Sequence, residues 1–347
     1  MTTVPASLAL AASTGADVRS PTVRALLQSG YGGTEVLRVG TVPRPVPGDA
    51  EVLVRVRAAG VDRGTWHLMT GRPYLMRVMG FGLTAPVNPV AGLDLAGEVV
   101  EVGPGVTRFR VGDHVFGIGR GSFAELAVAR EDKLALAPSG LPLEDAAVLG
   151  VSGITALQAH VAAGTKAGDR VLVVGASGGV GTFAVQIAKA LGASVTGVCS
   201  AEKAALVREL GADHVLDYRT EGLDGGAPYD VVLDIAGNAP LARLRRAMTP
   251  EGRLVFVGGE NGGDWTAGMG RPLLAMGLGL FVRQRFVMLA SEERHTHLER
   301  VAQLCEAGQL RPVIDRRIDL GEVPAALAAL EAGRVRGKVL VRVADVS

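Results

Sequence analysis

The stretch Val171–Ala184, VLVVGASGGVGTFA, decides the fold of this chain. Its first four residues are all apolar, which predicts a strand buried on both faces of a parallel sheet. A glycine-rich turn with the spacing G-x-x-G-x-x-G follows, and the residues after it favour a helix. Glycine lets the backbone approach a pyrophosphate closely, and a helix N-terminus supplies free N–H groups and a positive dipole end. The stretch therefore predicts a dinucleotide-binding strand, turn and helix.

The segments around this turn continue the same alternation. We expect helices at 144–162, 179–191 and 201–210, and further strands at 194–199, 214–217, 231–235 and 254–257. Strands that alternate with helices over this length favour an α/β fold with a Rossmann doubly wound parallel sheet.

The residues before Pro142 have a different pattern. Short strands are expected at 52–57, 95–102, 113–117 and 123–128, separated by Gly/Pro turns. This spacing predicts a β-rich barrel-like or sandwich domain. We expect a disordered tail over 1–20, the β-rich domain over 21–147, the Rossmann domain over 148–283, and a C-terminal segment, 284–347, that returns to the first domain.

Composition excludes several classes of protein. The 347 residues include 36 Lys+Arg and 35 Asp+Glu, so charge gives no reason to expect nucleic acid or an anionic membrane as partner. No basic residue precedes the short apolar patch Leu8–Leu10, and the apolar stretch 272–282 is shorter than the roughly 20 residues of a membrane span. Two cysteines are too few for a disulfide scaffold. We expect a soluble cytoplasmic protein.

The end of the strand at 194–199 bears on which dinucleotide binds. Sites that prefer NAD place a carboxylate there for the ribose 2′-hydroxyl. This chain has Ser200 instead, with Lys203 soon after and Tyr218 just past the next strand. A hydroxyl and an ammonium suit a 2′-phosphate, so the sequence predicts NADPH as cofactor. The alternative for Lys203 is an ordinary exposed helix residue.

Several further motifs carry a family resemblance. They are GLDLAGEVVEVG at 92–103, RVGDHVFG at 110–117, GITALQ at 153–158, VGASGGVG at 174–181, LGADHVLDY at 210–218 and GKV at 337–339. In this order they resemble the medium-chain dehydrogenase/reductase superfamily, and within it the zinc-independent quinone oxidoreductase branch. The resemblance implies a GroES-like catalytic domain completed by the C-terminal segment, a site in the cleft between the two domains, and a homodimer.

The resemblance also bears on zinc. Zinc alcohol dehydrogenases of this superfamily carry a cysteine in the stretch corresponding to residues 60–64, and a Gly-His-Glu motif where this chain reads Gly92-Leu93-Asp94. Residues 60–64 contain no cysteine, and Leu93 has no ligand atom. We therefore expect no catalytic zinc, and no Lewis acid to polarise an alcohol or a simple ketone.

Hydride transfer without a metal favours acceptors that already spread negative charge, namely quinones and α,β-unsaturated carbonyls such as enones and enals. The resemblance and the turn together make these residues the candidate cofactor ligands: Thr155, Ser177, Gly178, Gly179, Val180, Ser200, Lys203, Tyr218, Asn238, Gly258 and Lys338. The alternatives are a metal-free NAD(P)-dependent alcohol dehydrogenase or ketoreductase of the same fold, and a non-catalytic NADPH-binding sensor.

The acceptor side has two candidate catalytic residues, Asp62 and Tyr74. In related enoyl reductases a tyrosine near the position of Tyr74 donates a proton, so the resemblance makes Tyr74 a candidate acid. The other interpretations are a helix cap for Asp62 and a cleft wall for Tyr74. A quinone needs no dedicated acid, because water can protonate it.

Overall fold

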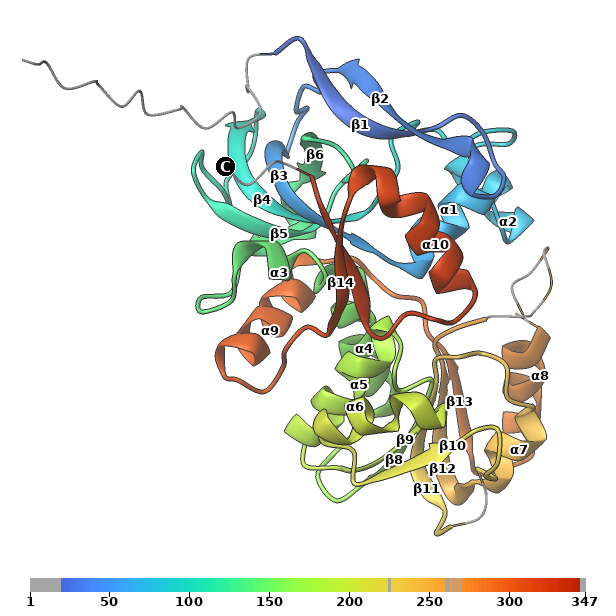
Figure 1. Cartoon of the computed structure of the whole chain (residues 1–347). Helices are drawn as coiled ribbons and strands as arrows, with labels where there is room; N and C mark the ends of the chain where they lie inside the picture. Colours follow the sequence, from blue (N-terminus) through green and yellow to red (C-terminus); the bar gives the residue numbers. More distant parts are fainter. Residues whose placement is uncertain are drawn as a thin grey trace, which may run out of the picture.

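The computed structural model describes residues 20–223, 226–259, 263, 265, 268 and 270–343. The expected disordered tail therefore lies outside the described residues, apart from Ser20. The described chain forms two lobes, each built on one large sheet (Figure 1). Among the described residues no helix has the length and apolar character that a membrane crossing needs.

The nucleotide lobe holds six parallel strands in the order β10-β9-β8-β11-β12-β13. They are β8 (Arg170–Val174), β9 (Ser194–Cys199), β10 (His214–Asp217), β11 (Tyr229–Asp234), β12 (Met248–Phe256) and β13 (Arg285–Met288). Its helices are α5 (Gly179–Ala190), α6 (Ala204–Glu209), α7 (Leu241–Arg246) and α8 (Gly270–Gly279). Val171, Leu172 and Val173 are fully buried, as the apolar run predicted for a two-sided parallel strand.

The catalytic lobe holds seven strands in the order β14-β15-β3-β4-β5-β7, with β6 paired to β3. They are β3 (Glu51–Val61), β4 (Asp94–Val102), β5 (His114–Ile118), β6 (Leu126–Arg130), β7 (Leu134–Leu136), β14 (Ile314–Asp319) and β15 (Lys338–Arg342). The hairpin of β1 (Thr22–Gln28) and β2 (Leu37–Pro43) lies at the top of this lobe (Figure 1). The two sheets together confirm the predicted fold class, a doubly wound parallel sheet with a separate β-rich domain.

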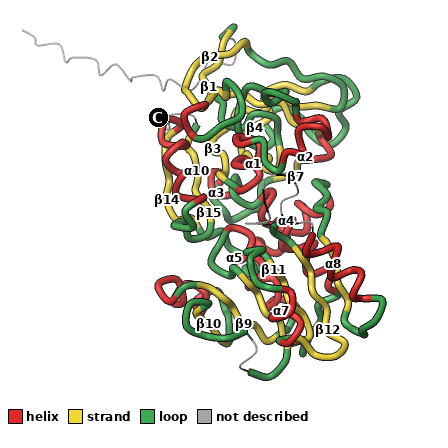
Figure 2. The backbone as a smooth tube through the Cα atoms, turned by 90° about the vertical axis from the view of Figure 1, so that its right-hand side faces the viewer, coloured by secondary structure: helices red, strands yellow, loops and turns green. Residues whose placement is uncertain are grey.

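The remaining helices support this frame. They are α1 (Arg63–Thr70), α2 (Tyr74–Met76), α3 (Leu143–Ala146), α4 (Gly150–Ala163), α9 (His295–Glu306) and α10 (Val323–Glu331). Helix α4 contacts β4 and β5 of one sheet and β12 of the other, so it lies between the lobes, as the view at right angles also shows (Figure 2). A cluster of buried side chains from both lobes surrounds it, including Phe116, Ile154 and Phe183.

The domain boundary expected at 283/284 falls before β13, which pairs with β12 of the parallel sheet. The nucleotide lobe therefore extends to Met288. Beyond it, β15 pairs antiparallel with β3, and β14 pairs with β15 at the edge of the seven-stranded sheet. The last strands of the chain thus lie in the sheet of the first lobe.

Several expected elements begin at other residues; β12, for example, starts at Met248 rather than at 254. The helix predicted at 144–162 is broken between α3 and α4, because the carboxylate of Asp94 accepts a hydrogen bond from the Val151 backbone N–H, 2.7 Å away, at the start of α4. A Cβ at Gly150 would lie 2.5 Å from the same carboxylate. The strand predicted at 123–128 begins at Leu126, and the residues before it contact β1 instead: the Phe123 carbonyl accepts from the Leu26 N–H at 2.8 Å.

Candidate cofactor and active site

The glycines of the predicted phosphate turn serve different purposes. A Cβ at Gly181 would lie 2.1 Å from the Gly175 carbonyl oxygen, so this glycine lets helix α5 start close against its own turn. Gly175 has φ of +92°, a conformation that glycine adopts without strain. A Cβ at Gly178 would meet only the Gly175 oxygen, at 3.6 Å, so this position faces open space. Gly178 is therefore where a pyrophosphate can approach the backbone.

Helix α5 begins directly after this open position. Gly178 is its N-cap, with extended backbone and no side chain to cap the first turn. The helix is 12 residues long, which gives it a full dipole whose positive end lies at Gly179 and Val180. An uncapped helix start beside an open glycine fits the pyrophosphate of a dinucleotide.

The turn also touches the last strand of the other lobe. The Gly337 N–H donates to the Ser177 carbonyl at 2.9 Å, and Gly178 and Gly337 form a parallel bridge. Gly337 has φ of +67°, and a Cβ there would lie 2.4 Å from the Val313 carbonyl oxygen. The phosphate turn is thus fixed against the start of β15, at the joint between the lobes.

The predicted adenosine-side residues gather beyond β9. Ser200 follows the strand and is buried, and the backbone N–H of Tyr218 donates to the Cys199 carbonyl at 3.3 Å. Lys203 lies nearby, but its Nζ donates to the carbonyls of Gly333 and Val335, at 2.8 and 2.9 Å. Its ammonium therefore binds the loop that leads into β15.

Sequence reasoning missed Arg336, an exposed residue of that loop. Burial, followed by the nearby Arg336 cation, lowers the pKa of the Lys203 ammonium. Two cations from different lobes, Lys203 and Arg336, thus lie close together just beyond β9. Lys203 and Arg336 are far apart in the sequence, and Arg336 belongs to no recognisable motif, so the sequence alone did not reveal this pair.

The residues predicted around the nicotinamide half lie at the carboxyl ends of β11 and β12. Asn238 is exposed in the loop after β11, and Gly258 follows β12. A Cβ at Gly258 would lie 2.1 Å from the Ile235 carbonyl oxygen, so close packing of the two strand ends already requires this glycine. Thr155 on α4 is half-buried, and its hydroxyl donates to the Val151 carbonyl at 2.6 Å.

A partly buried ion pair that the sequence did not reveal holds the loop carrying Asn238. Arg271, at the start of α8, donates to the Asp234 carboxylate at 2.7 Å and to the Gly237 carbonyl at 2.5 Å. Burial raises the pKa of Asp234, while Arg271 opposes that rise. Helix α8 thereby fixes the loop on the nicotinamide side of the sheet.

Lys338, predicted near the cofactor, lies at the first position of β15 and is only 1% exposed. Its Nζ is 3.1 Å from the Asp94 carboxylate and 3.1 Å from the Ser152 hydroxyl. The ammonium is thus enclosed behind the phosphate turn, with Asp94 as its counterion.

Asp62, predicted to be catalytic, is the N-cap of α1. One carboxylate oxygen accepts from the Thr65 N–H at 2.7 Å and from the Thr65 hydroxyl at 3.1 Å. The other oxygen, Oδ2, is buried and has no hydrogen-bond partner among the described residues. The expected capping role and a free acceptor therefore coexist in one side chain.

Tyr74, the other candidate, belongs to an aromatic stack. The Arg77 guanidinium lies over the rings of Tyr31 and Tyr74, with centroid distances of 4.3 and 4.7 Å. Trp265 of the nucleotide lobe meets Tyr74 edge to face at 5.4 Å. The Tyr31 hydroxyl donates to the Phe81 and Gly82 carbonyls, each at 2.8 Å, and so anchors the segment that follows. Tyr74 stands where the two lobes face each other.

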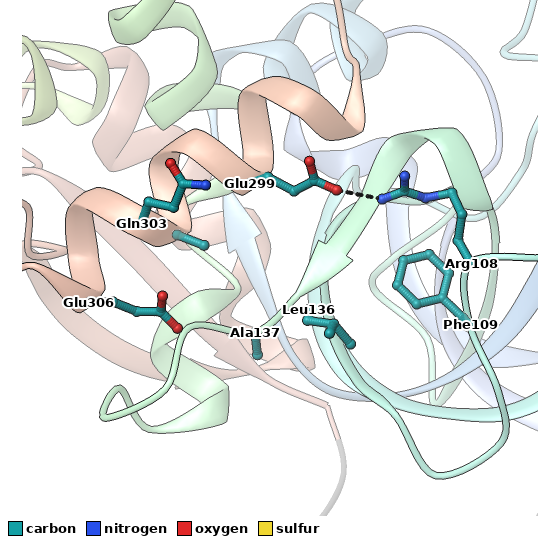
Figure 3. Close-up of a pocket in the computed structure, with 8 residues that line it drawn as sticks. Arg108, Phe109, Leu136, Ala137, Glu299, Gln303 and Glu306 are labelled. Atoms are coloured by element: carbon teal, nitrogen blue, oxygen red, sulfur yellow. Dashed lines mark hydrogen bonds and ion pairs between the residues drawn. The ribbon is translucent and has the colours of Figure 1, made fainter.

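A separate depression of about 410 Å³ lies between β7 and α9 (Figure 3). Arg108 and Glu299 form an ion pair of 2.8 Å at one end, and Gln303 and Glu306 line the other end. None of its lining residues is a candidate cofactor or acceptor ligand. Within the described ranges, no group of three or more His, Cys, Asp or Glu residues is arranged to hold a metal ion.

With this geometry in place, comparisons with known proteins identify the family. Residues 48–139 match the family model for the alcohol dehydrogenase GroES-like domain, and residues 210–341 match the one for zinc-binding dehydrogenases. A chloroplast envelope quinone oxidoreductase homolog of Arabidopsis thaliana is 33% identical over 337 residues, covering 92% of this chain and 98% of its own. The chain belongs to the medium-chain dehydrogenase/reductase superfamily.

Other members of the superfamily agree with this assignment. The human mitochondrial NAD(P)H oxidoreductase RTN4IP1 is 32% identical, covering 94% of this chain and 90% of its own. The solved quinone oxidoreductase of Coxiella burnetii superposes with a TM-score of 0.80 at 26% identity, covering 92% of this chain and 99% of its own. The resemblance to the quinone oxidoreductase-like branch is confirmed, and this member of the superfamily is an oxidoreductase with a nicotinamide cofactor.

Proposed function

We propose that this protein transfers hydride from NADPH to quinones and α,β-unsaturated carbonyls without a metal ion. The observation that carries the proposal is the open glycine of the phosphate turn, Gly178, which is fixed against the start of β15. Strand β15 pairs with β3, and β3 leads directly into Asp62. Together with Tyr74, which contacts Trp265 of the nucleotide lobe, Asp62 forms the proposed acceptor wall. Leu93 stands where metal-dependent relatives have a histidine, so this wall supplies hydrogen-bonding and stacking groups. An acceptor that delocalises its own developing charge suits such a wall.

The cofactor would supply the hydride, and the chain's own residues hold both reactants. The turn at Gly178 and the first N–H groups of α5 bind the pyrophosphate. The loop fixed by Arg271 borders the nicotinamide end, where Gly258 brings two strand ends together. Positioning of the two reactants supplies most of the rate enhancement in such a site.

Preference for NADPH over NADH rests on the residues after β9. Ser200 stands where a carboxylate would repel a 2′-phosphate, and Lys203 and Arg336 place positive charge beside it. The exposed ring of Tyr218 adds a hydroxyl at the same edge. Arg336→Ala is expected to weaken NADPH binding about tenfold and to leave NADH binding unchanged, because only NADPH carries the extra phosphate.

On the acceptor side, Asp62 and Tyr74 have separate roles in the proposal. The unpartnered Oδ2 of Asp62 is a buried acceptor, and such a group costs free energy unless a ligand donates to it. The Tyr74 ring offers a stacking surface, and its hydroxyl offers a proton for an enolate. Reduction of a quinone needs the ring alone, whereas reduction of an enal uses the hydroxyl as well.

The experiment follows absorbance at 340 nm with NADPH or NADH against a quinone, a 2-enal and a saturated ketone. We expect oxidation of NADPH by the two conjugated acceptors and none by the ketone. Equal rates with NADH would overturn the cofactor preference. Turnover of the saturated ketone that persists after chelation would favour a metal-free alcohol dehydrogenase. NADPH binding with no turnover by any acceptor would favour a sensor.

We also propose that two copies of the chain pair through the edge of the nucleotide lobe. Strand β13 is the edge strand of its sheet, and helix α8 beside it carries apolar side chains that are at least half exposed. They are Leu273, Leu274 and Met276, followed by Leu280 and Phe281 just after the helix. Phe281→Asp should convert a dimer to a monomer in light scattering, whereas a monomeric parent protein would contradict the proposal.

A further inference from the structure

The phosphate turn rests on a buried pair of opposite charges. Lys338 is 1% exposed and Asp94 is fully buried, and their charged atoms are 3.1 Å apart. The second oxygen of Asp94 accepts from the Val151 N–H at 2.7 Å. Ser152 adds a neutral hydroxyl 3.1 Å from the ammonium. Strand β4, strand β15 and the interlobe helix α4 therefore meet at this pair.

The ammonium lies directly behind the turn. A Cβ at Gly179 would be 3.1 Å from the Lys338 side chain and 3.2 Å from the Ser152 hydroxyl. The neighbouring Gly337 bridges to Gly178 through the backbone. The Lys338 side chain therefore runs beneath the turn at Gly178, whose other face is open to the pyrophosphate.

Two charged groups act on Asp94. Lys338 of β15 favours its ionised form, and Asp62 before α1 disfavours it. Burial acts more strongly than either and raises the pKa of Asp94 to about 7. The Asp94 carboxyl thus exchanges its proton near neutral pH, and the net charge of the buried pair changes with it.

We propose that Asp94 is a positioning residue for the cofactor, which holds Lys338 beneath the phosphate turn and takes up a proton when the pyrophosphate binds. In the free protein the carboxylate neutralises the ammonium. A pyrophosphate on the other face of the turn supplies a second counterion, so the carboxylate is no longer needed and its neutral form is favoured. By linkage, protonation of Asp94 strengthens cofactor binding to the same degree.

This inference rests on the proposed function only in requiring that NADPH bind at the turn. The test is titration calorimetry of NADPH at pH 7 in two buffers of different ionisation enthalpy, which counts the protons taken up. The wild-type protein should take up more protons than Asp94→Asn, because only the wild-type carboxylate can be protonated as the pyrophosphate binds. The cofactor's own titration cancels in this difference.

The matched control is Ser152→Ala, which removes a neighbour of the ammonium without removing a charge. It should keep the wild-type proton uptake. The Asn variant should also bind NADPH more tightly than the wild type at pH 8 and about equally at pH 6. The gain is limited to about tenfold for each pH unit above the pKa of the Asp94 carboxyl in the free protein. A purely structural role for Asp94 would change stability and leave no such pH profile.

Equal proton uptake by the wild type and the Asn variant would overturn the inference and leave the proposed function standing. Failure of NADPH to bind the wild type at all would overturn both. If Asp94→Asn does not fold, wild-type affinity for NADH, which lacks the titrating 2′-phosphate, is measured from pH 6 to 8.5. The inference requires this affinity to weaken as pH rises through 7, and a flat profile contradicts it.

Discussion

The proposed site has a cofactor wall and an acceptor wall, which are built in different ways. The cofactor wall consists mainly of backbone: an open glycine, an uncapped helix start and carbonyls fixed by Gly337. The acceptor wall consists of side chains that hold one another, with Arg77 between Tyr31 and Tyr74. Binding by backbone groups requires positions without a side chain, such as Gly178. Binding by side chains requires particular residues, such as Tyr74. Substitutions should therefore affect stability and specificity differently on the two walls.

The largest effect is expected within the phosphate turn itself. Gly181→Ala places a methyl group 2.1 Å from the Gly175 oxygen and should destabilise the protein by about 3 kcal/mol. Gly178→Ala meets nothing closer than 3.6 Å, so it should leave stability unchanged and weaken NADPH binding. Urea unfolding and NADPH titration measure the two effects. Equal loss of stability in both variants would contradict the division between packing and binding glycines.

The next effect concerns acid stability of the cofactor side. His160 of α4 is buried, contacting the Ala184 carbonyl at 2.8 Å and the Thr165 hydroxyl at 3.0 Å. Burial lowers its pKa from 6.5 to about 4. Between these values the unfolded chain binds more protons than the folded one, so stability falls as pH decreases below 6.5.

From pH 7 to pH 5 this histidine should cost about 2 kcal/mol of stability. His160→Gln removes the titration, so its loss of stability over the same range should be smaller by that amount. Unfolding midpoints in urea at both pH values measure the difference. An identical pH dependence in the two proteins would show that His160 titrates as an exposed group, against its burial.

On the acceptor wall, Tyr74→Phe should separate the two classes of acceptor. The ring and its contacts with Arg77 and Trp265 remain, but the hydroxyl is lost. We expect kcat/KM to fall about tenfold for a 2-enal and less than about twofold for a quinone, because only the enal product needs a proton from the enzyme. Tyr31→Phe is the control, since its hydroxyl anchors the Phe81 backbone and should affect both acceptors alike.

The smallest effect tests the double role of Asp62. Asp62→Ala removes the N-cap of α1 and should cost about 1 kcal/mol of stability. Asp62→Asn keeps a capping oxygen, so its stability should stay within about 0.5 kcal/mol of wild type. Both variants lose the carboxylate that the proposal places against a ligand, so both should lose activity. Full activity in the Asn variant would show that Asp62 only caps helix α1 and has no role toward the acceptor.

The sequence predicted the cofactor wall better than the acceptor wall, because a site built from backbone follows a local sequence pattern and a site built from side chains does not. The strand, turn and helix at 171–184 have a fixed spacing because backbone geometry requires it, and the structure has them there. The partners of Lys203 and Arg271 are carbonyls and carboxylates of distant segments, which no local pattern specifies. The stack around Arg77 likewise joins residues that are far apart in the sequence, Tyr31 and Trp265 among them.

The break between α3 and α4 shows the same limit. The pattern over 144–162 is helical throughout, yet the Val151 N–H at the start of α4 donates to the side chain of Asp94. From the sequence, Asp94 stood out only as a departure from a zinc-ligand motif. Its role in ending one helix and starting another, and its pairing with Lys338, depend on strands that meet only in the folded chain.

The position of β15 has a consequence for the order in which the protein forms. Val339 pairs with Val61, and Gly337 supports the phosphate turn, so strand β15, which follows every other described element, completes both the catalytic sheet and the nucleotide site. During synthesis the nucleotide lobe emerges before its support does. A chain released before this strand lacks the support of the phosphate turn and of the catalytic sheet, so its ability to bind the cofactor depends on the synthesis of β15.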